Sequence, residues 1–225
     1  MTNDAATHDE KLAQTPGQER QRGRPQVRPD NETRDIIYEA SRHVFAEKGF
    51  AAASMETIAR AAGVSTKTLY RLIDNKAVLF EQMVRQRIDR FVNAVNLNAC
   101  ENRNFEVALG DALIICGELV LDREVIAIQR MILGESDAFP AMAEGFYEYA
   151  MRRTVSALGD WLKQQQSRGV IVLDDHDDAA GMLLGMLIFE PQRAVWFGHR
   201  DAPSHRAIEQ RARRCAKLFI SGCRV

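Results

Sequence analysis

The stretch from Ser54 to Ile73 constrains the fold more than any other part of the chain. Its apolar positions predict two short helices joined by a tight turn. Ser54 and Ser65 occupy the positions of helix N-caps, and Gly63 is the residue type best able to take the left-handed conformation that ends a helix. The small Ala59 leaves room for the two helices to cross at a steep angle. A helix-turn-helix unit of this kind can lay its second helix in the major groove of DNA.

Helical periodicity continues on both sides of this unit. Residues 33–50 carry apolar side chains at helical spacing, and another helix opens at Asp74–Lys76 and continues to about Val95. We therefore predict an all-α chain. Three short helices form a head over residues 31–78, and a long fourth helix leads into a larger helical body over residues 79–225.

The head resembles the DNA-binding domain of the tetracycline-repressor (TetR) family of bacterial transcription regulators. The resemblance is detailed from residue 33 to about 80, and the rest of the chain is similar only in length and helical character. The sequence departs from the family pattern at Leu72, where the family often has His or Tyr, and at Ile73, where it often has Phe. The matching segments are Phe45–Phe50, Ile58–Ser65, Thr68–Tyr70 and Lys76.

The resemblance implies that the second helix of the unit reads DNA. Its first residues, Ser65 to Thr68, would face base edges, because hydroxyls and a lysine can bond to bases in the major groove. Tyr70 and Lys76 match positions that hold the phosphate backbone, and the amide end of the helix at Lys76 also favours a phosphate. The alternatives are a half-buried core Tyr70, a solvated Lys67 and an Arg71 that only keeps the helix soluble. The DNA-contacting residues expected in the head are Thr33, Ser54, Ser65, Thr66, Lys67, Thr68, Tyr70, Arg71 and Lys76.

Charge is divided unevenly along the chain, although the net charge is only −1. Residues 20–76 contain eleven Lys or Arg and seven Asp or Glu, whereas residues 99–205 contain nine and seventeen. A basic head beside an acidic body fits contact with DNA phosphates at one end of the molecule.

Residues 1–30 form a polar, basic tail that we expect to be disordered. The tail has no apolar core with a cleavage signal, so no secretory peptide is expected. Arg22-Gly-Arg-Pro25 resembles the centre of an AT-hook, in which extended arginines enter a narrow minor groove. Arg22 and Arg24 would then add DNA contacts, and the alternative is a solvated linker.

The body is predicted to hold a small apolar effector. The TetR resemblance implies such a site, and methionines and aromatic residues suit a variable apolar ligand, although they are equally typical of any helical core. Helices are expected over residues 105–121, 123–133, 139–167, 175–198 and 204–221. The effector-binding residues expected are Ile115, Leu119, Ile128, Met131, Phe146, Tyr147, Met182, Met186 and Phe189.

The last two predicted helices carry apolar stripes that could form a homodimer. Two helices from each subunit would make a four-helix seam with twofold symmetry. The alternative is that both stripes pack only within one subunit. The stripe residues are Gly181, Leu184, Gly185, Leu187 and Ile188 on one helix and Ile208, Ala212, Cys215, Leu218 and Phe219 on the other.

Other kinds of site are not expected. Asp174–Asp178 precedes a helix, where acidic residues cap free amides more often than they bind a metal. The four cysteines have no metal-binding spacing, and Cys116 and Cys215 are expected in the core. No catalytic motif is visible, so we expect neither an enzyme nor a cofactor, and no stretch is apolar enough to cross a membrane.

Together these features predict a cytoplasmic, nucleoid-associated bacterial regulator that binds a palindromic operator as a homodimer and releases it when a small apolar effector binds. One alternative is a helical enzyme or carrier for an apolar molecule, with the head as an interaction module. Another is an activator or architectural DNA-binding protein without an effector. The salt dependence of DNA binding and the pattern of bound genomic sites distinguish these possibilities.

Overall fold

The computed structural model describes residues 28–99 and 104–223, and all regular structure in these two segments is helical. The all-α prediction is confirmed for them. The elements are α1 (Asp30–Ala52), α2 (Met55–Ala61), α3 (Thr66–Leu72), α4 (Lys76–Ala99), α5 (Phe105–Val120), α6 (Arg123–Glu135), α7 (Pro140–Phe146), the π-helix η1 (Tyr147–Arg152), α8 (Arg153–Ser167), α9 (His176–Trp196) and α10 (His205–Cys223).

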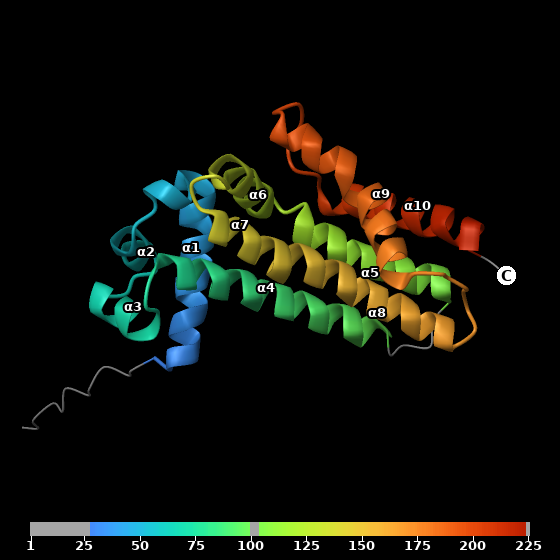
Figure 1. Cartoon of the computed structure of the whole chain (residues 1–225), viewed down its shortest axis with the longest axis horizontal. Helices are drawn as coiled ribbons and strands as arrows, with labels where there is room; N and C mark the ends of the chain where they lie inside the picture. The colour runs from blue at the N-terminus through green and yellow to red at the C-terminus, as the bar shows by residue number, and fades with distance from the viewer. Residues whose placement is uncertain (1–27, 100–103, 224–225) are drawn as a thin grey trace, which may run out of the picture.

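Helices α1, α2 and α3 gather at one end of the molecule, and α4 runs from them along the body beside α8 (Figure 1). The C-terminus lies at the opposite end. The Phe50 ring lies 5.6 Å from the Phe45 ring and 5.0 Å from the Phe139 ring, centroid to centroid. The head therefore shares a core with the body.

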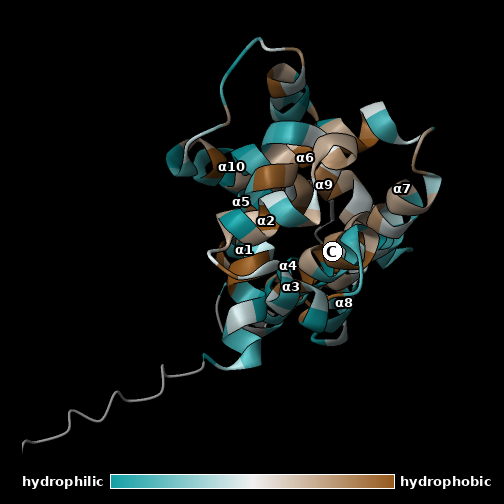
Figure 2. Ribbon diagram, turned by 90° about the vertical axis from the view of Figure 1, so that its left-hand side faces the viewer, coloured by the Kyte–Doolittle hydropathy of each residue, from teal (hydrophilic) through white to brown (hydrophobic). Residues whose placement is uncertain are grey.

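The predicted boundary near residue 78 does not separate two cores. One buried cluster joins head residues to Ile128 and Ile132 of α6 and to Met142 of α7. A second cluster fills the far end of the body around Trp161 and Leu113. Figure 2 shows that most helices alternate between brown apolar stretches and teal hydrophilic ones. The assignment of residues 31–78 and 79–225 to two domains remains a prediction.

The helix predicted over 139–167 is one continuous rod with a local change of pitch. Pro140 stands in the first turn of α7, where its missing N–H is not needed. Residues Tyr147–Arg152 then wind as a π-helix before α8 continues the rod. A π-turn adds a residue to the helical repeat, which apolar periodicity does not reveal.

Helix α9 continues through Pro191, although proline cannot donate the usual hydrogen bond to the carbonyl of Leu187. Arg211 of α10 replaces this donor, since its Nε lies 2.7 Å from the Leu187 carbonyl oxygen and 3.1 Å from that of Met186. This contact joins α10 to α9 at the turn where Pro191 leaves a backbone hydrogen bond unmade.

Candidate DNA-binding surface and effector cavity

The turn between α2 and α3 has the geometry expected for a helix-turn-helix. The Ser54 hydroxyl accepts the Thr57 N–H, and the Ser65 hydroxyl accepts the Thr68 N–H. Gly63 has a φ of 66°, and Ala59 is buried where the helices meet. The predicted caps and turn are therefore confirmed.

Helix α3 keeps its apolar side in the core and presents polar side chains to solvent. Leu69 and Leu72 are buried, whereas Lys67 is exposed and Tyr70 is 47% exposed. Leu72 faces the core, so this position does not offer the polar side chain, His or Tyr, that the family often has there. The exposed side of α3 offers a lysine, an aromatic hydroxyl and threonine hydroxyls to a ligand.

The hydroxyls at the start of α3 are partly occupied by one another. The Ser65 Oγ lies 2.8 Å from the Thr68 Oγ1, and Thr66 and Thr68 are half-buried. Lys67 and Ser65 are the exposed members of this group.

Four further residues predicted to contact DNA have partners inside the chain. Thr33 is buried, and its hydroxyl donates to the Pro29 carbonyl at 3.0 Å. Ser54 caps α2. Arg71 forms a two-pronged ion pair with Asp30, with N–O distances of 2.8 and 2.7 Å. The DNA contacts of these residues remain predictions, and the structure adds an intramolecular role for each of them.

The fourth is Lys76, which stabilises the end of α1. Its Nζ donates to the carbonyl oxygens of Phe50 at 2.6 Å, Ala51 at 3.2 Å and Ala53 at 2.9 Å. The ammonium also lies 4.6 Å from the centroid of the Phe50 ring. The lysine therefore donates hydrogen bonds to carbonyl oxygens that the break at Gly49 leaves without helical partners. Arg22 and Arg24 lie outside the described residues.

The body contains a cavity of about 620 Å³ between α4, α6, η1 and α9. Its volume is in the range of small-molecule sites, and its wall is mainly apolar. It reaches the surface where exposed apolar residues line it: Leu133, Tyr147, Met151 and Phe189.

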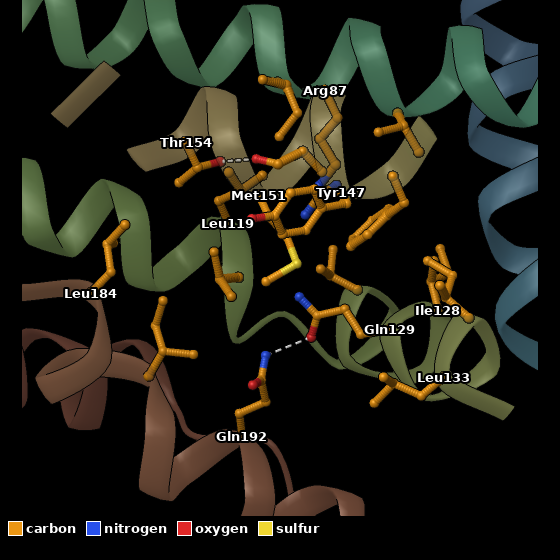
Figure 3. Close-up of a pocket in the computed structure, with 18 of the residues that line it drawn as sticks. Arg87, Leu119, Ile128, Gln129, Leu133, Tyr147, Met151, Thr154, Leu184 and Gln192 are labelled. Carbon is orange, nitrogen blue, oxygen red and sulfur yellow. Dashed lines mark hydrogen bonds between the residues drawn. The ribbon is translucent and has the colours of Figure 1, made fainter. Parts of the chain in front are cut away.

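Polar groups occupy two sides of this cavity (Figure 3). Arg87 reaches in from α4 beside Tyr147, and the Gln192 amide donates to the Gln129 oxygen at 2.7 Å on the opposite side. Leu119 and Met151 lie between them. An apolar molecule with a polar group at its end would match this distribution.

Five of the nine predicted effector residues line the cavity: Leu119, Ile128, Phe146, Tyr147 and Phe189. The other four lie elsewhere. Ile115 packs against the far core, Met131 packs against the head core, and Met182 and Met186 are exposed on α9. Residue type cannot distinguish these environments, because methionine and isoleucine fill cores and cavity walls alike.

Three polar cavity residues were not predicted from the sequence: Arg87, Gln129 and Gln192. Arg87 stands three residues after Val84 and four before Phe91, which are both buried on α4. A charged residue in the buried register of a helix was the available signal.

The stripes expected to form a dimer seam are partly core. Leu184, Leu187, Ile208, Ala212 and Cys215 are buried within the subunit, and Gly181 and Gly185 line the cavity. These five side chains pack within the subunit, whereas Gly181 and Gly185 are exposed, and the homodimer seam remains a prediction. Met182 and Leu218 remain 61% and 67% exposed.

Asp175 caps α9, since its Oδ1 accepts the N–H groups of Asp177 and Asp178, both at 2.9 Å. The predicted structural role of this acidic run is confirmed. Among the described residues no group of His, Cys, Asp and Glu is placed to hold a metal. No helix in the same segments is long and apolar enough to span a membrane.

Comparison with known proteins agrees with this architecture. The model of the bacterial regulatory proteins of the tetR family matches residues 37–83. The model of the C-terminal domain of AefR-like transcriptional repressors matches residues 109–222. The two matches cover the helix-turn-helix and most of the body.

Individual relatives are also transcription regulators. The HTH-type transcriptional repressor ComR of Escherichia coli K12 is 28% identical over 153 residues, which span 67% of this chain and 71% of ComR. A TetR-family regulator structure from Mesorhizobium loti MAFF303099 is 25% identical, with a TM-score of 0.75 over 88% of this chain and all of that chain. The flavonoid-responsive regulator FrrA is 29% identical, with a TM-score of 0.62 over 86% of this chain and 98% of that chain. This chain belongs to the TetR family of bacterial transcription regulators, with a body of the AefR-like type.

Proposed function

We propose that this protein is a ligand-responsive repressor that releases a palindromic operator when a small, largely apolar effector enters the body. One observation carries the proposal: α6 both lines the cavity and joins the head. Its Ile128 and Ile132 face the cavity and belong to the core shared with the head. A ligand that displaces α6 therefore also displaces the support of α1.

We assign DNA recognition to α3. We expect base contacts from the hydroxyls of Ser65, Thr66 and Thr68 and from the ammonium of Lys67. We expect a phosphate contact from Tyr70. Arg22 and Arg24 would add contacts in an A·T-rich minor groove beside the operator.

Reading a palindrome requires two heads, so we propose a homodimer. The exposed apolar residues Met182, Met186 and Leu218 lie on α9 and α10, which pack against each other through Arg211. Their burial against a second copy would remove this apolar surface from water.

We infer that the effector shifts α4, which begins at Lys76 in the head and lines the cavity at Arg87. We expect a coupling free energy of about 1–3 kcal/mol between the two sites, so that the effector weakens operator binding as much as the operator weakens effector binding. FrrA is a flavonoid-responsive regulator, and its response to a small molecule supports a small-molecule effector for this chain. We expect it to act in the cytoplasm and to be no enzyme.

Two measurements on the full-length protein test the proposal. Genomic fragments that it selects should be few and should contain a palindrome near promoters, whereas diffuse coverage would indicate an architectural protein. A compound library screened against the operator complex should then yield apolar compounds that release the DNA. The compounds should bind less tightly to the complex than to the free protein, and equal affinity for both would refute the switch.

A further inference from the structure

The wall of the cavity carries an excess of positive charge. Four arginines and a single acidic residue line it among the described residues. A cation in apolar surroundings is costly unless it has a partner. The charged wall residues are Arg42, Arg87, Arg90, Arg193 and Glu39.

Three of these arginines already have close partners. A carboxylate or an aromatic ring lies against each guanidinium, so little of their binding capacity is left for a ligand. The partners are Glu124 for Arg42 (2.9 Å), Asp35 for Arg90 (3.5 Å) and the Phe189 ring for Arg193 (3.5 Å to the ring centroid).

Arg87 has a longer ion pair than Arg42 or Arg90. Its nearest carboxylate oxygen is the Asp122 Oδ1, 3.7 Å from Nη2, which is too long for a hydrogen bond. Its Nε is buried and has no hydrogen-bond partner within the described residues, which also holds for the Arg42 Nε, although the Arg42 guanidinium is held by Glu124 at 2.9 Å. Burial lowers the pKa of Arg87, yet a guanidinium stays charged at any physiological pH. The side chain is 33% exposed and is therefore a partly desolvated cation with unused donors.

We propose that the effector has an apolar body and one carboxylate group, and that the carboxylate binds the guanidinium of Arg87. This inference deepens the proposed function, because it rests on the cavity being the effector site. The fork of N–H donors on an arginine matches the two oxygens of a carboxylate. Leu119 and Met151, which lie between Arg87 and Gln129, would contact the apolar body (Figure 3).

Asp122 can lose Arg87 at little cost. Its Oδ1 accepts the N–H groups of Glu124 and Val125, both at 3.1 Å, and lies 3.5 Å from Nη1 of Arg42. The carboxylate thus remains partnered when Arg87 turns to a ligand. Because Arg42 belongs to α1, the exchange also alters the charges that hold the head.

Calorimetric titration of the full-length protein with decanoate and decan-1-ol tests the proposal, with both probes below the concentration at which they aggregate. The two molecules share their chain and differ in the head group. We expect the wild type to bind decanoate at least about tenfold more tightly than decan-1-ol. Arg87→Leu should remove this preference and leave the affinity for decan-1-ol within about twofold.

Arg153→Leu is the matched control. Arg153 does not line the cavity, and its side chain is 48% exposed and paired with Asp89 of α4 at 2.7 Å. This variant should keep the preference for decanoate. If Arg87→Leu does not fold, Arg87→Gln, which keeps amide donors without the charge, should still lose most of the preference.

Three results would overturn the inference: equal binding of both probes by the wild type, an undiminished preference in the Arg87 variants, or no binding of decanoate. These results are distinct from failure of the proposed function. If the protein selects an operator and decan-1-ol releases it as well as decanoate does, the repressor proposal stands and the carboxylate proposal falls. If no operator is selected, the repressor proposal itself falls.

Discussion

The carboxylate of Glu135, at the end of α6, accepts the backbone N–H of Phe50 in the head at 3.1 Å. It also accepts the N–H of Ala51 at 2.9 Å, while Lys76 binds the carbonyl oxygens of the same two residues. The peptide that follows the break in α1 is therefore held by an anion from the body and a cation from α4. This arrangement ties the head to the helix that lines the cavity.

Removing the Glu135 carboxylate should loosen this junction. Hydrogen bonds to charged groups contribute about 1.5–3 kcal/mol, so Glu135→Ala should lower the free energy of unfolding by about that amount. The amides of Phe50 and Ala51 should also exchange their hydrogens faster. Urea denaturation and hydrogen exchange measure the two effects, with Glu144→Ala on exposed α7 surface as the control. Unchanged protection of both amides would contradict the clamp.

Gly49 should not tolerate a side chain. Its φ of 84° and ψ of 167° lie in a region that is essentially restricted to glycine, and a Cβ would stand 2.6 Å from the Glu135 Oε1. Gly49→Ala should therefore cost about 1–3 kcal/mol of stability. Gly134→Ala, inside α6 with open space around its Cα, should instead stabilise the protein by about 0.5–1 kcal/mol. Equal denaturation midpoints for the two variants would be incompatible with this geometry.

Asp30 should restrain Arg71 from binding DNA phosphates. Asp30→Asn frees the guanidinium, so we expect tighter DNA binding and a salt dependence steeper by about one unit of slope. Asp35→Asn removes the same charge from α1 but leaves the Arg71 pair intact. If both variants give the same slope in binding titrations, Arg71 is not released onto DNA.

The Asp30–Arg71 pair should not respond to pH in the neutral range. The hydrogen bond from Arg71 lowers the pKa of Asp30 below its ordinary value. The stabilisation is present above the ordinary Asp pKa of about 3.9 and is lost as the pH falls through the lower pKa of the folded state. Between pH 6 and 8 the salt slope of Asp30→Asn relative to wild type should therefore stay constant, and an NMR titration of the Asp30 carboxyl with a midpoint at or above the ordinary value would contradict the pairing.

Cys116 should be inert in the folded protein. Complete burial raises its pKa to about 12, so almost no thiolate exists at pH 8. Mass spectrometry after iodoacetamide treatment at pH 8 should find Cys116 unmodified in native protein and modified in urea. Native labelling at the rate seen in urea would show that α5 is not packed as described.

The features that follow from local sequence were predictable. Ser54, Ser65 and Asp175 cap the helices that they precede, and Gly63 has a positive φ at the expected turn. Each depends on chain neighbours within a few residues. Local backbone chemistry determines such features largely without the rest of the fold.

Contacts between distant residues were not predictable. Asp30 and Arg71 are separated by 41 positions, and Glu135 and Phe50 by 85. Which apolar residues surround a cavity also depends on the packing of whole helices, so Met182 was expected in the cavity and lies on the surface instead. Periodicity identifies the buried side of a helix but not the neighbour that covers it.

The most direct test of the account is the salt dependence of binding to a selected operator fragment by wild type, Lys67→Ala and Lys48→Ala. Lys67 is exposed on α3 and Lys48 is exposed near the end of α1, so both variants lose one surface lysine. We predict that Lys67→Ala weakens specific binding by about 1–3 kcal/mol and relaxes the sequence preference, whereas Lys48→Ala changes neither. Equal losses in the two variants, or full sequence preference in Lys67→Ala, would contradict the claim that α3 reads the operator.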